Sequence, residues 1–376
     1  MGDTIPPMGD VPYNWTLPVA REVKKLVSVP VATVGRVVSL EAGEKILEDG
    51  DADIVAYGRS MLADADIANK AESGECIREC LNCNKGCVDA IQGRRYISCV
   101  LNAENGNEGT VFIKPAQDKK KVAVVGGGIA GLEAARVAAK RGHDVVIYEK
   151  SEKIGGQIHL AAVPPRKNEI LRAIEYYEKI LPELSVKVEL NTEPTYEELN
   201  QYDNVILAIG AHNMELPMSV ENSNVVSSWD VLNGEAVSGN CAVLGGGLVG
   251  TETAEFLAQK GLKVSIIEML DQIATGESET VMPLIMKDFE EHDVKQYVNT
   301  KVKSIENNVI FATNTKDGAD ITIEADTIIN ALGSKKNLFD DSKLTVPFEY
   351  VGDCSGERTA DISAAIRSGY QAGNEI

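Results

Sequence analysis

The chain lacks the features that are typical of nucleic-acid-binding and membrane proteins. Aromatic residues make up only 5% of its 376 residues, which disfavours a surface that stacks bases. Acidic residues outnumber basic ones, and the net charge of −20 gives no overall field that attracts phosphate polymers or anionic membranes. The longest apolar stretch, residues 122–139, contains four glycines and is better explained as a strand, a turn and a helix than as a membrane span. We therefore expect neither a nucleic acid nor a membrane as partner.

A signal peptide is also missing from the sequence as given. Residues 1–7 show neither a basic region nor an apolar core. Seven cysteines, four of them clustered, in a chain without an export signal indicate metal chemistry in a reducing cytoplasm rather than disulfides. At 376 residues the chain should hold two or three domains, and its composition is ordinary for an α/β protein. The only partner that we expect for it is a small-molecule substrate.

The clustered cysteines are Cys80, Cys83, Cys87 and Cys99, with the spacing C-x2-C-x3-C-x11-C. Four thiolates bind either zinc or an iron–sulfur cluster. These gaps differ from the paired C-x2-C knuckles of most zinc ribbons, which favours a 4Fe-4S cluster and leaves zinc as the alternative. Cys76 with Cys80 and Cys83 imitates a radical-SAM triplet, but that interpretation leaves two cysteines without a role. The remaining cysteines are interpreted as small buried residues: Cys76, Cys241 and Cys354.

The N-terminal part predicts two consecutive βα units. Residues 29–34 and 52–57 are near-continuous apolar strands that each close with a Gly-Arg pair, which indicates parallel strands. In a (β/α)8 barrel, the loops after strands 7 and 8 form a phosphate site. Gly58 would let a phosphate approach the backbone, and Arg36 and Arg59 would supply forked donors, with surface ion pairs as the alternative role. Two units cannot close a barrel, so we expect a fragment or a partner chain that supplies the other strands.

A glycine-rich turn follows the apolar strand predicted over residues 121–125. Gly126, Gly128 and Gly131 form G-x-G-x-x-G, which allows a tight turn, backbone approach to a pyrophosphate and close helix–strand packing. The helix that follows offers amide donors at its N-terminus. The next predicted strand ends at Glu149, where an acid would bind a ribose hydroxyl pair. The strand, the helix and the acid together predict a dinucleotide site.

A second fingerprint of the same kind lies downstream. It consists of Gly245, Gly247 and Gly250, and the next predicted strand ends at Glu268. No arginine follows this acid, so a 2′-phosphate would meet a carboxylate without a compensating cation, and we predict NADH over NADPH. Glu252 falls just past the turn, either near the nicotinamide or simply as a carboxylate at a helix N-terminus.

The cysteine spacing, the preceding segment GRSMLAD at 58–64 and the two fingerprints together resemble the C-terminal half of the 2,4-dienoyl-CoA reductase / 2-enoate reductase / trimethylamine dehydrogenase group. Members of this group fuse an old-yellow-enzyme barrel to a disulfide-reductase-like module. The likeness covers essentially the whole chain. It implies four parts, which are a partial (β/α)8 barrel with strands 7–8 (1–78), a 4Fe-4S segment (79–120), an FAD-binding domain (121–236 and 334–376) and an inserted NADH-binding domain (237–333).

The resemblance also implies a role for each matching residue. The FMN phosphate would contact Arg36, Gly58 and Arg59. The four clustered cysteines would ligate the 4Fe-4S cluster. The FAD would be bound by Gly126, Gly128, Ala130, Gly131, Glu149, Gly156, Gln157, Gly210, Gly352 and Asp353. The NADH would be bound by Gly245, Gly247, Gly250, Glu252 and Glu268.

The resemblance implies that electrons pass from NADH to FAD, the cluster and FMN, and then to an activated C=C bond of an enoate or enoyl-CoA type. Alternatives are an NADH diaphorase or electron-transfer subunit that feeds a separate partner, an amine dehydrogenase-like member, and a redox sensor without turnover. The intact second fingerprint favours the reductases. The family's first six barrel strands are missing, so no proton donor can be assigned. The missing barrel half is expected either in the same polypeptide, of which this chain is a fragment, or as a separate chain, and a homo-oligomer is compatible with this interpretation.

Overall fold

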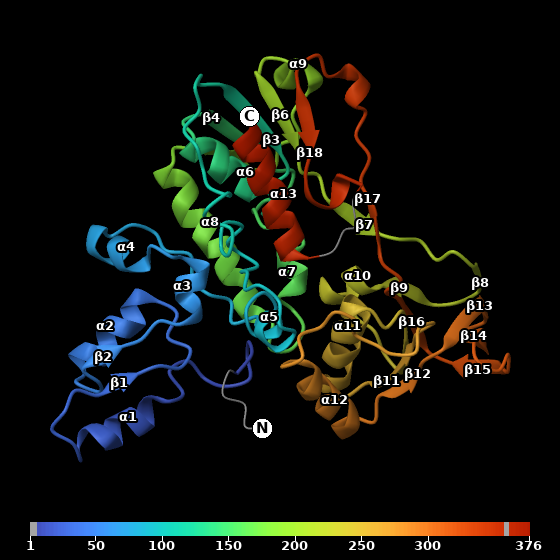
Figure 1. The fold of residues 1–376 in the computed structure, drawn as a ribbon. Helices are drawn as coiled ribbons and strands as arrows, with labels where there is room; N and C mark the ends of the chain where they lie inside the picture. Colours follow the sequence, from blue (N-terminus) through green and yellow to red (C-terminus); the bar gives the residue numbers. More distant parts are fainter. Residues whose placement is uncertain (1–5, 357–360) are drawn as a thin grey trace. The chain divides into compact units, whose positions relative to one another are not determined.

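The computed structural model describes residues 6–356 and 361–376, which divide into two compact units (Figure 1). The first unit comprises the chain up to Ile158, residues 169–210 and the residues from 338 onward; the second comprises residues 159–168 and 211–337. The predicted absence of a signal peptide concerns residues 1–7, of which 1–5 lie outside the described residues. Among the described helices, none combines the length and the apolar composition that a membrane span requires.

The N-terminal segment of the first unit contains two short strands. β1 (Ala32–Thr33) and β2 (Ile54–Val55) pair in parallel, as predicted. Helix α2 (Leu40–Glu48) connects them, and the amide of Ala42 donates to Oγ of Ser39 at 3.2 Å, which caps its first turn. The strands are shorter than predicted, because within the described residues each pairs only with the other. The other helices are α1 (Leu17–Lys24), α3 (Arg59–Ala63), α4 (Ile67–Ser73) and α5 (Val88–Gln92).

The centre of the first unit is a five-stranded parallel sheet of order β18-β6-β3-β4-β5. Its central strand is apolar after Lys121, because both faces of a parallel sheet are covered, and Val122, Ala123 and Val124 are fully buried. The strands are β3 (Lys121–Val125), β4 (Asp144–Tyr148), β5 (Lys187–Glu189), β6 (Asn204–Leu207) and β18 (Phe348–Tyr350).

Helix α6 (Ile129–Lys140) follows β3 and packs along α13 (Ile362–Glu375), beside which it lies in Figure 1. The two helices approach closely because α13 carries glycine at the contact. A Cβ on Gly369 would lie 2.1 Å from the carbonyl oxygen of Ala130. The first unit also contains α8 (Arg172–Glu183), α9 (Tyr196–Leu199), η2 (Asp341–Lys343) and η3 (Gly352–Cys354), while α7 (Ile158–Ala161) and η1 (Asn168–Leu171) cross the boundaries between the two units.

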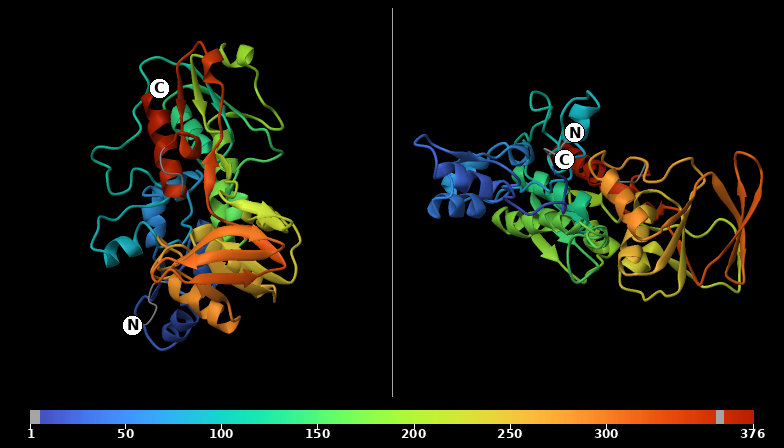
Figure 2. Two further views of the ribbon diagram at one scale, coloured as in Figure 1. Left: turned by 90° about the vertical axis from the view of Figure 1, so that its right-hand side faces the viewer. Right: turned by 90° about the horizontal axis from the view of Figure 1, so that it is seen from below.

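The second unit repeats the strand, glycine turn and helix arrangement. Its five-stranded parallel sheet has the order β12-β11-β10-β16-β9, and a further four-stranded sheet has the order β15-β14-β13-β8. Strands β13, β14 and β15 pair antiparallel and lie side by side in the left view of Figure 2. The parallel strands are β9 (Val225–Ser227), β10 (Asn240–Leu244), β11 (Lys263–Ile267), β12 (Lys295–Tyr297) and β16 (Thr327–Asn330). The others are β7 (Ala211–Asn213), β8 (Ser219–Glu221), β13 (Thr300–Glu306), β14 (Val309–Asn314), β15 (Asp320–Glu324) and β17 (Ser334–Lys336).

The second unit buries apolar side chains on both faces of its parallel sheet, because successive residues of a strand point to opposite sides. Val243 packs on one face with Phe289, whereas Ala242 packs on the other with Ile305 and Ile310 of the antiparallel sheet. The helices are α10 (Ser228–Leu232), α11 (Leu248–Gln259) and α12 (Met282–Glu291). The predicted α/β fold with two dinucleotide-type sheets is confirmed.

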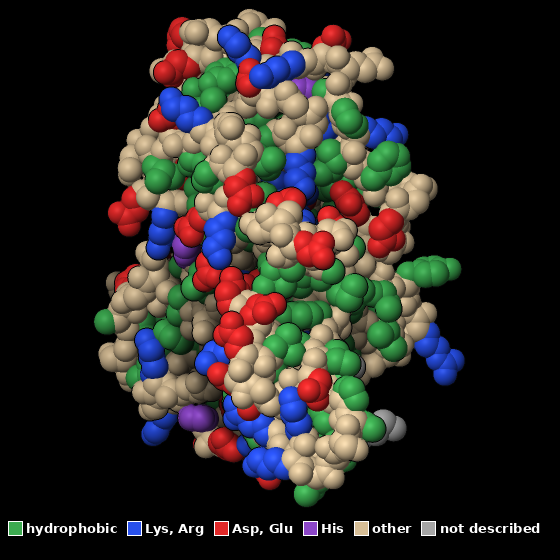
Figure 3. Space-filling model, turned by 90° about the vertical axis from the view of Figure 1, so that its left-hand side faces the viewer, with side chains coloured by type: hydrophobic (Ala, Val, Ile, Leu, Met, Phe, Trp, Pro, Cys, Tyr) green, Lys and Arg blue, Asp and Glu red, His purple; other side chains and the backbone are tan. Residues whose placement is uncertain are grey.

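The charged side chains show no single-sign patch on the face drawn in Figure 3. Acidic and basic side chains are interspersed there, with apolar side chains between them.

Candidate functional site

The turn between β3 and α6 leaves open space at the middle glycine of its fingerprint. Gly126 has φ +108°, and a Cβ there would lie 2.3 Å from the carbonyl oxygen of Ala208. A Cβ on Gly131 would lie 2.1 Å from the carbonyl oxygen of Gly126. A Cβ on Gly128 would meet nothing within 4 Å. The outer glycines therefore serve packing, while Gly128 leaves the room that a pyrophosphate needs. Gly156 lies against this turn, since a Cβ on Gly156 would lie 3.3 Å from Cα of Gly128.

Glu149 is fixed at the end of β4, beside this turn. Its Oε2 accepts from the amide of Gly127 at 2.7 Å, and its Oε1 accepts from the amide of Ser151 at 2.8 Å. The side chain is buried. The carboxylate is thus held next to the glycine turn by backbone donors, in the place predicted for a ribose-binding acid.

Four further predicted FAD residues lie together, although more than 140 positions separate Gln157 and Gly210 from Gly352 and Asp353 in the sequence. Nε2 of Gln157 donates to Oδ2 of Asp353 at 2.9 Å. A Cβ on Gly352 would lie 2.8 Å from Cβ of Ala130 in the first turn of α6. Gly210 lies on the same side, because a Cβ there would be 3.7 Å from Nε2 of Gln157. The structure therefore brings these residues to the glycine turn.

The second glycine turn, between β10 and α11, has the same construction. Gly245 has φ +100°, and a Cβ on Gly250 would lie 1.9 Å from the carbonyl oxygen of Gly245. A Cβ on Gly247 would meet nothing within 4 Å. Oε2 of Glu268 accepts from the amide of Gly246 at 2.6 Å. Its Oε1 accepts from the amide of Leu270 at 2.7 Å, so both carboxylate oxygens are held at the end of β11.

Glu252, on α11, is paired with a lysine. Nζ of Lys167 lies 2.8 Å from Oε1 of Glu252 and 3.3 Å from Oε2 of Glu277, within the second unit. Arg166 beside it pairs with Glu255. Burial raises the pKa of Glu255 to about 7, although Arg166 opposes the shift. No sequence motif predicts this group of ion pairs, because its cations come from residues 159–168 and its acids lie far downstream in the sequence.

The four clustered cysteines line a single cavity, together with Arg59. In the described residues, no three His, Cys, Asp or Glu side chains converge in a way that would hold one metal ion. Cysteines spread around a cavity suit a cluster better than a single ion, because each iron of the cluster takes one thiolate. Burial, together with the neighbouring cysteines, raises the pKa of Cys83 to about 12; burial also raises that of Cys99 to about 11. Donor set and cavity therefore fit a 4Fe-4S cluster.

Backbone amides are directed at the sulfurs of all four cysteines. The amide of Asn82 lies 3.3 Å from Sγ of Cys80. Amide hydrogen bonds also reach the sulfurs of the other three cysteines, from Lys85 to Cys83, from Val88 to Cys87, and from Leu101 and Asn102 to Cys99. Hydrogen bonds to cysteine sulfur are a means by which proteins stabilise and tune an iron–sulfur cluster.

A close backbone contact brings the last two cysteines together. The amide of Ser98 donates to the carbonyl oxygen of Gly86 at 2.7 Å, and a Cβ on Gly86 would lie 2.6 Å from the carbonyl oxygen of Ser98. Cys87 directly follows Gly86, and Cys99 directly follows Ser98. Of the other cysteines, Cys241 and Cys354 are buried as predicted, whereas Cys76 is only partly buried. The prediction was wrong for Cys76, which lies in the irregular segment after α4 and keeps part of its surface exposed.

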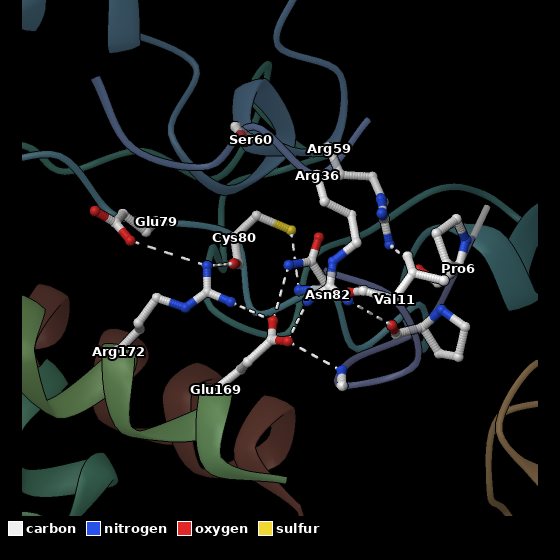
Figure 4. A network of polar contacts seen from close by, with 12 residues as sticks. Pro6, Val11, Arg36, Arg59, Ser60, Glu79, Cys80, Asn82, Glu169 and Arg172 are labelled. Atoms are coloured by element: carbon white, nitrogen blue, oxygen red, sulfur yellow. Dashed lines mark hydrogen bonds and ion pairs between the residues drawn. The ribbon is translucent and has the colours of Figure 1, made fainter. Parts of the chain in front are cut away.

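The two predicted FMN-phosphate arginines donate to protein atoms (Figure 4). Arg36 is buried; its Nη1 donates to the carbonyl oxygens of Pro7 and Val11, and its Nη2 pairs with Glu169. Nη1 of Arg59 donates to Oδ1 of Asn84 and, at 3.3 Å, to the carbonyl oxygen of Pro6. Arg36 is therefore not in a surface ion pair, and a role in phosphate binding stays a prediction for both.

Comparison with known proteins yields two family matches. Residues 120–351 match the family described as pyridine nucleotide-disulphide oxidoreductase. Residues 12–76 match the NADH:flavin oxidoreductase / NADH oxidase family. The first match contains both glycine turns, and the second contains the two N-terminal βα units, which are thus the end of a TIM barrel.

Three of the similar proteins are longer than this chain. Bilirubin reductase of Mediterraneibacter gnavus (strain CC55_001C) is 46% identical over 385 residues, which covers 100% of this chain and 60% of that protein. Cinnamate reductase of Clostridium sporogenes is 35% identical over 382 residues, which covers 97% of this chain and 55% of that protein. The structure of a 2-naphthoyl-CoA reductase complex superposes with a TM-score of 0.89 at 29% identity, covering 100% of this chain and 58% of that one. The chain thus spans less than two thirds of the length of these relatives.

Proposed function

Because the chain belongs to the pyridine nucleotide-disulphide oxidoreductase family, we propose that it is the NADH-oxidising part of a flavin and iron–sulfur reductase that acts on an activated C=C bond. One observation carries the proposal. A single chain combines two glycine turns, each beside an anchored carboxylate, with a cavity lined by four cysteines. These sites are what a protein needs to take two electrons from NADH and to pass them on one at a time.

The two family matches give FAD, NAD(P)H and FMN as the cofactors of such proteins. We assign FAD to the turn beside Glu149, NADH to the turn beside Glu268 and a 4Fe-4S cluster to the cysteine cavity. FMN is assigned to Arg36, Gly58 and Arg59. When bound, these groups supply the redox chemistry. The chain's own residues position them, since the open middle glycine of each turn admits a pyrophosphate and the amides around the cavity stabilise thiolate charge.

We retain the domain assignment from the sequence, with barrel strands at 1–78, the cluster segment at 79–120, and the NADH domain (237–333) inserted into the FAD domain (121–236 and 334–376). The cytoplasmic location and the homo-oligomer also stay predictions. The names of the relatives, which are reductases of bilirubin, cinnamate and 2-naphthoyl-CoA, support a conjugated, unsaturated substrate. An amine dehydrogenase role is weaker, because the second fingerprint is intact.

The missing barrel strands are proposed to cover the N-terminal strands. Apolar side chains there are exposed, with Val29 at 65%, Val34 at 56% and Ile54 at 53%. Apolar exposure of this kind marks a surface that another element covers. The remaining strands, from the same polypeptide or from a separate chain, would then carry the substrate contacts and the proton donor. An NADH diaphorase that feeds a separate partner is the second candidate function.

The purified chain tests the proposal directly. We expect FAD, about four irons per chain and NADH-dependent reduction of an artificial dye without added FMN. Reduction of an unsaturated acid or thioester is expected only when the barrel half is supplied. Dye reduction that persists while the supplied barrel half restores no C=C reduction would select the diaphorase. A colourless protein, or one that holds zinc in place of iron, contradicts the proposed electron path.

The carboxylate of Glu268 is expected to select NADH. The kcat/KM for NADH should exceed that for NADPH by roughly 100-fold, because a 2′-phosphate beside a carboxylate places like charges together. In Glu268→Gln this ratio should narrow to roughly 10-fold or less. Glu149→Gln is the matched control, since it makes the same change at the other turn and should leave the ratio unaltered. Equal use of both coenzymes by the unaltered protein would contradict the assignment.

A further inference from the structure

Glu169, at the start of the helical segment that leads into α8, collects hydrogen bonds from three other segments of the first unit (Figure 4). Its Oε1 accepts from the amide of Gly9 at 3.0 Å and pairs with Nη2 of Arg36. Its Oε2 accepts from Nδ2 of Asn82 at 3.0 Å and pairs with Nη2 of Arg172. Glu169, Arg36 and Asn82 are all buried. A buried carboxylate with this many donors is held in one place.

Arg172 extends this group to a cysteine. Its Nη2 pairs with Glu169, while its Nη1 donates to the carbonyl oxygen of Cys80 at 2.5 Å. The planar guanidinium thus joins a carboxylate and a backbone carbonyl at once, which a lysine ammonium on a flexible stem does less well. The ring of Tyr13 lies 4.8 Å from the guanidinium carbon of Arg36 and 5.2 Å from that of Arg172.

The loop that carries the first cysteines needs this support. Asn82 and Asn84 have φ of +54° and +62° and are buried, in a stretch without regular secondary structure. The backbone there has no helix or strand ladder, so side chains must satisfy and orient it. Arg172 holds the carbonyl of Cys80, and Glu169 holds the side chain of Asn82. Between these two anchors lies the amide of Asn82, which is directed at Sγ of Cys80 at 3.3 Å.

We propose that Glu169 and Arg172 are positioning residues for the Cys80 thiolate, and that their charges set the reduction potential of the iron–sulfur cluster. The proposal rests on the proposed function, which places a cluster at the four cysteines. Reduction adds negative charge to the cluster, so a nearby cation stabilises the reduced form and a nearby carboxylate destabilises it. Glu169 and Arg172 therefore act on the potential in opposite directions.

Three variants separate charge from position. In Arg172→Gln, which removes the cation, we expect a lower midpoint potential. In Glu169→Gln, which removes the carboxylate but keeps a hydrogen-bonding side chain of the same length, we expect a higher one. Arg172→Lys keeps the positive charge but loses the planar guanidinium that donates to Glu169 and to Cys80 at once. Its potential should lie nearer to that of the unaltered protein, while a ferrous chelator should remove its iron roughly 10-fold faster.

The measurements are a redox titration followed by the electron paramagnetic resonance of the reduced cluster, the rate of iron release to the chelator, and the bound FAD as a check on folding. Arg141→Gln is the matched control, because Arg141 also donates to two backbone carbonyls, but these belong to Lys114 and Gly373 rather than to a cysteine. Both its potential and its iron release should be unchanged.

The outcomes are distinct. Opposite shifts in Arg172→Gln and Glu169→Gln support the inference, and so does loss of iron from the three variants with FAD retained and the control intact. Variants that match the control in potential and in iron release overturn it, and shifts of the same sign overturn its electrostatic part. An unaltered protein that binds FAD but holds no iron–sulfur cluster contradicts the proposed function and, with it, this inference.

Discussion

Replacement of Cys83 by serine is expected to remove nearly all iron from the protein, from about four atoms per chain to less than about one. Cys83 lies among the other three cysteines on the cavity wall, and the serine hydroxyl is a far weaker ligand for iron than a thiolate. Bound FAD and its reduction by NADH should persist, because other residues build both glycine turns. Iron analysis, the visible absorption spectrum and NADH-dependent dye reduction measure the three parts of this result.

Cys76→Ser is the control for this experiment. Cys76 does not line the cavity, so its replacement should leave the iron content unchanged. Cys99→Ser should behave like Cys83→Ser. Iron that is lost from Cys76→Ser but kept in Cys99→Ser would instead select the triplet of Cys76, Cys80 and Cys83. Zinc in the unaltered protein would select the structural-metal alternative.

Replacement of Gly250 by alanine is expected to abolish reduction of the FAD by NADH, with a fall of roughly 100-fold or more in rate. A Cβ there would lie 1.9 Å from the carbonyl oxygen of Gly245, so the turn and α11 must move apart. Overpacking of this kind costs about 1–3 kcal/mol and displaces the amides at the helix N-terminus. The FAD should remain bound, since its turn lies in the other unit. Rapid-mixing absorbance measurements and thermal unfolding follow the two effects.

Gly247→Ala distinguishes packing from binding. A Cβ at Gly247 meets nothing within 4 Å, so the fold should be as stable as before. The added methyl group would occupy the space assigned to the pyrophosphate, and we expect the Kd for NADH to rise roughly 10-fold. Gly109→Ala is the control, since a Cβ there also meets nothing within 4 Å and the residue lies outside both turns. Unchanged NADH affinity in Gly247→Ala would place the pyrophosphate elsewhere.

Short-range patterns were sufficient to predict the two strand–turn–helix units and the cysteine set. In each unit the strand, the glycines and the acid lie within about 30 residues, and this short range is what makes a nucleotide fingerprint visible in one sequence. The cysteine spacing likewise identified the residues that line one cavity. The start of helix α2 is also a local feature, because the side chain of Ser39 caps its first turn.

Tertiary structure alone decided which distant residues meet. Glu169 binds Arg36 and Asn82 across 133 and 87 positions, and Gln157 binds Asp353 across 196 positions. No periodicity links such residues, because their contacts depend on how sheets and helices pack rather than on local chain geometry. The N-terminal strands are shorter than predicted for the same reason, since the length of a strand depends on partner strands that lie elsewhere in the chain. The spacing of nearby residues therefore predicts the nucleotide fingerprints and the cysteine set. The hydrogen bonds that hold the cysteine loop form only when distant segments of the folded chain meet.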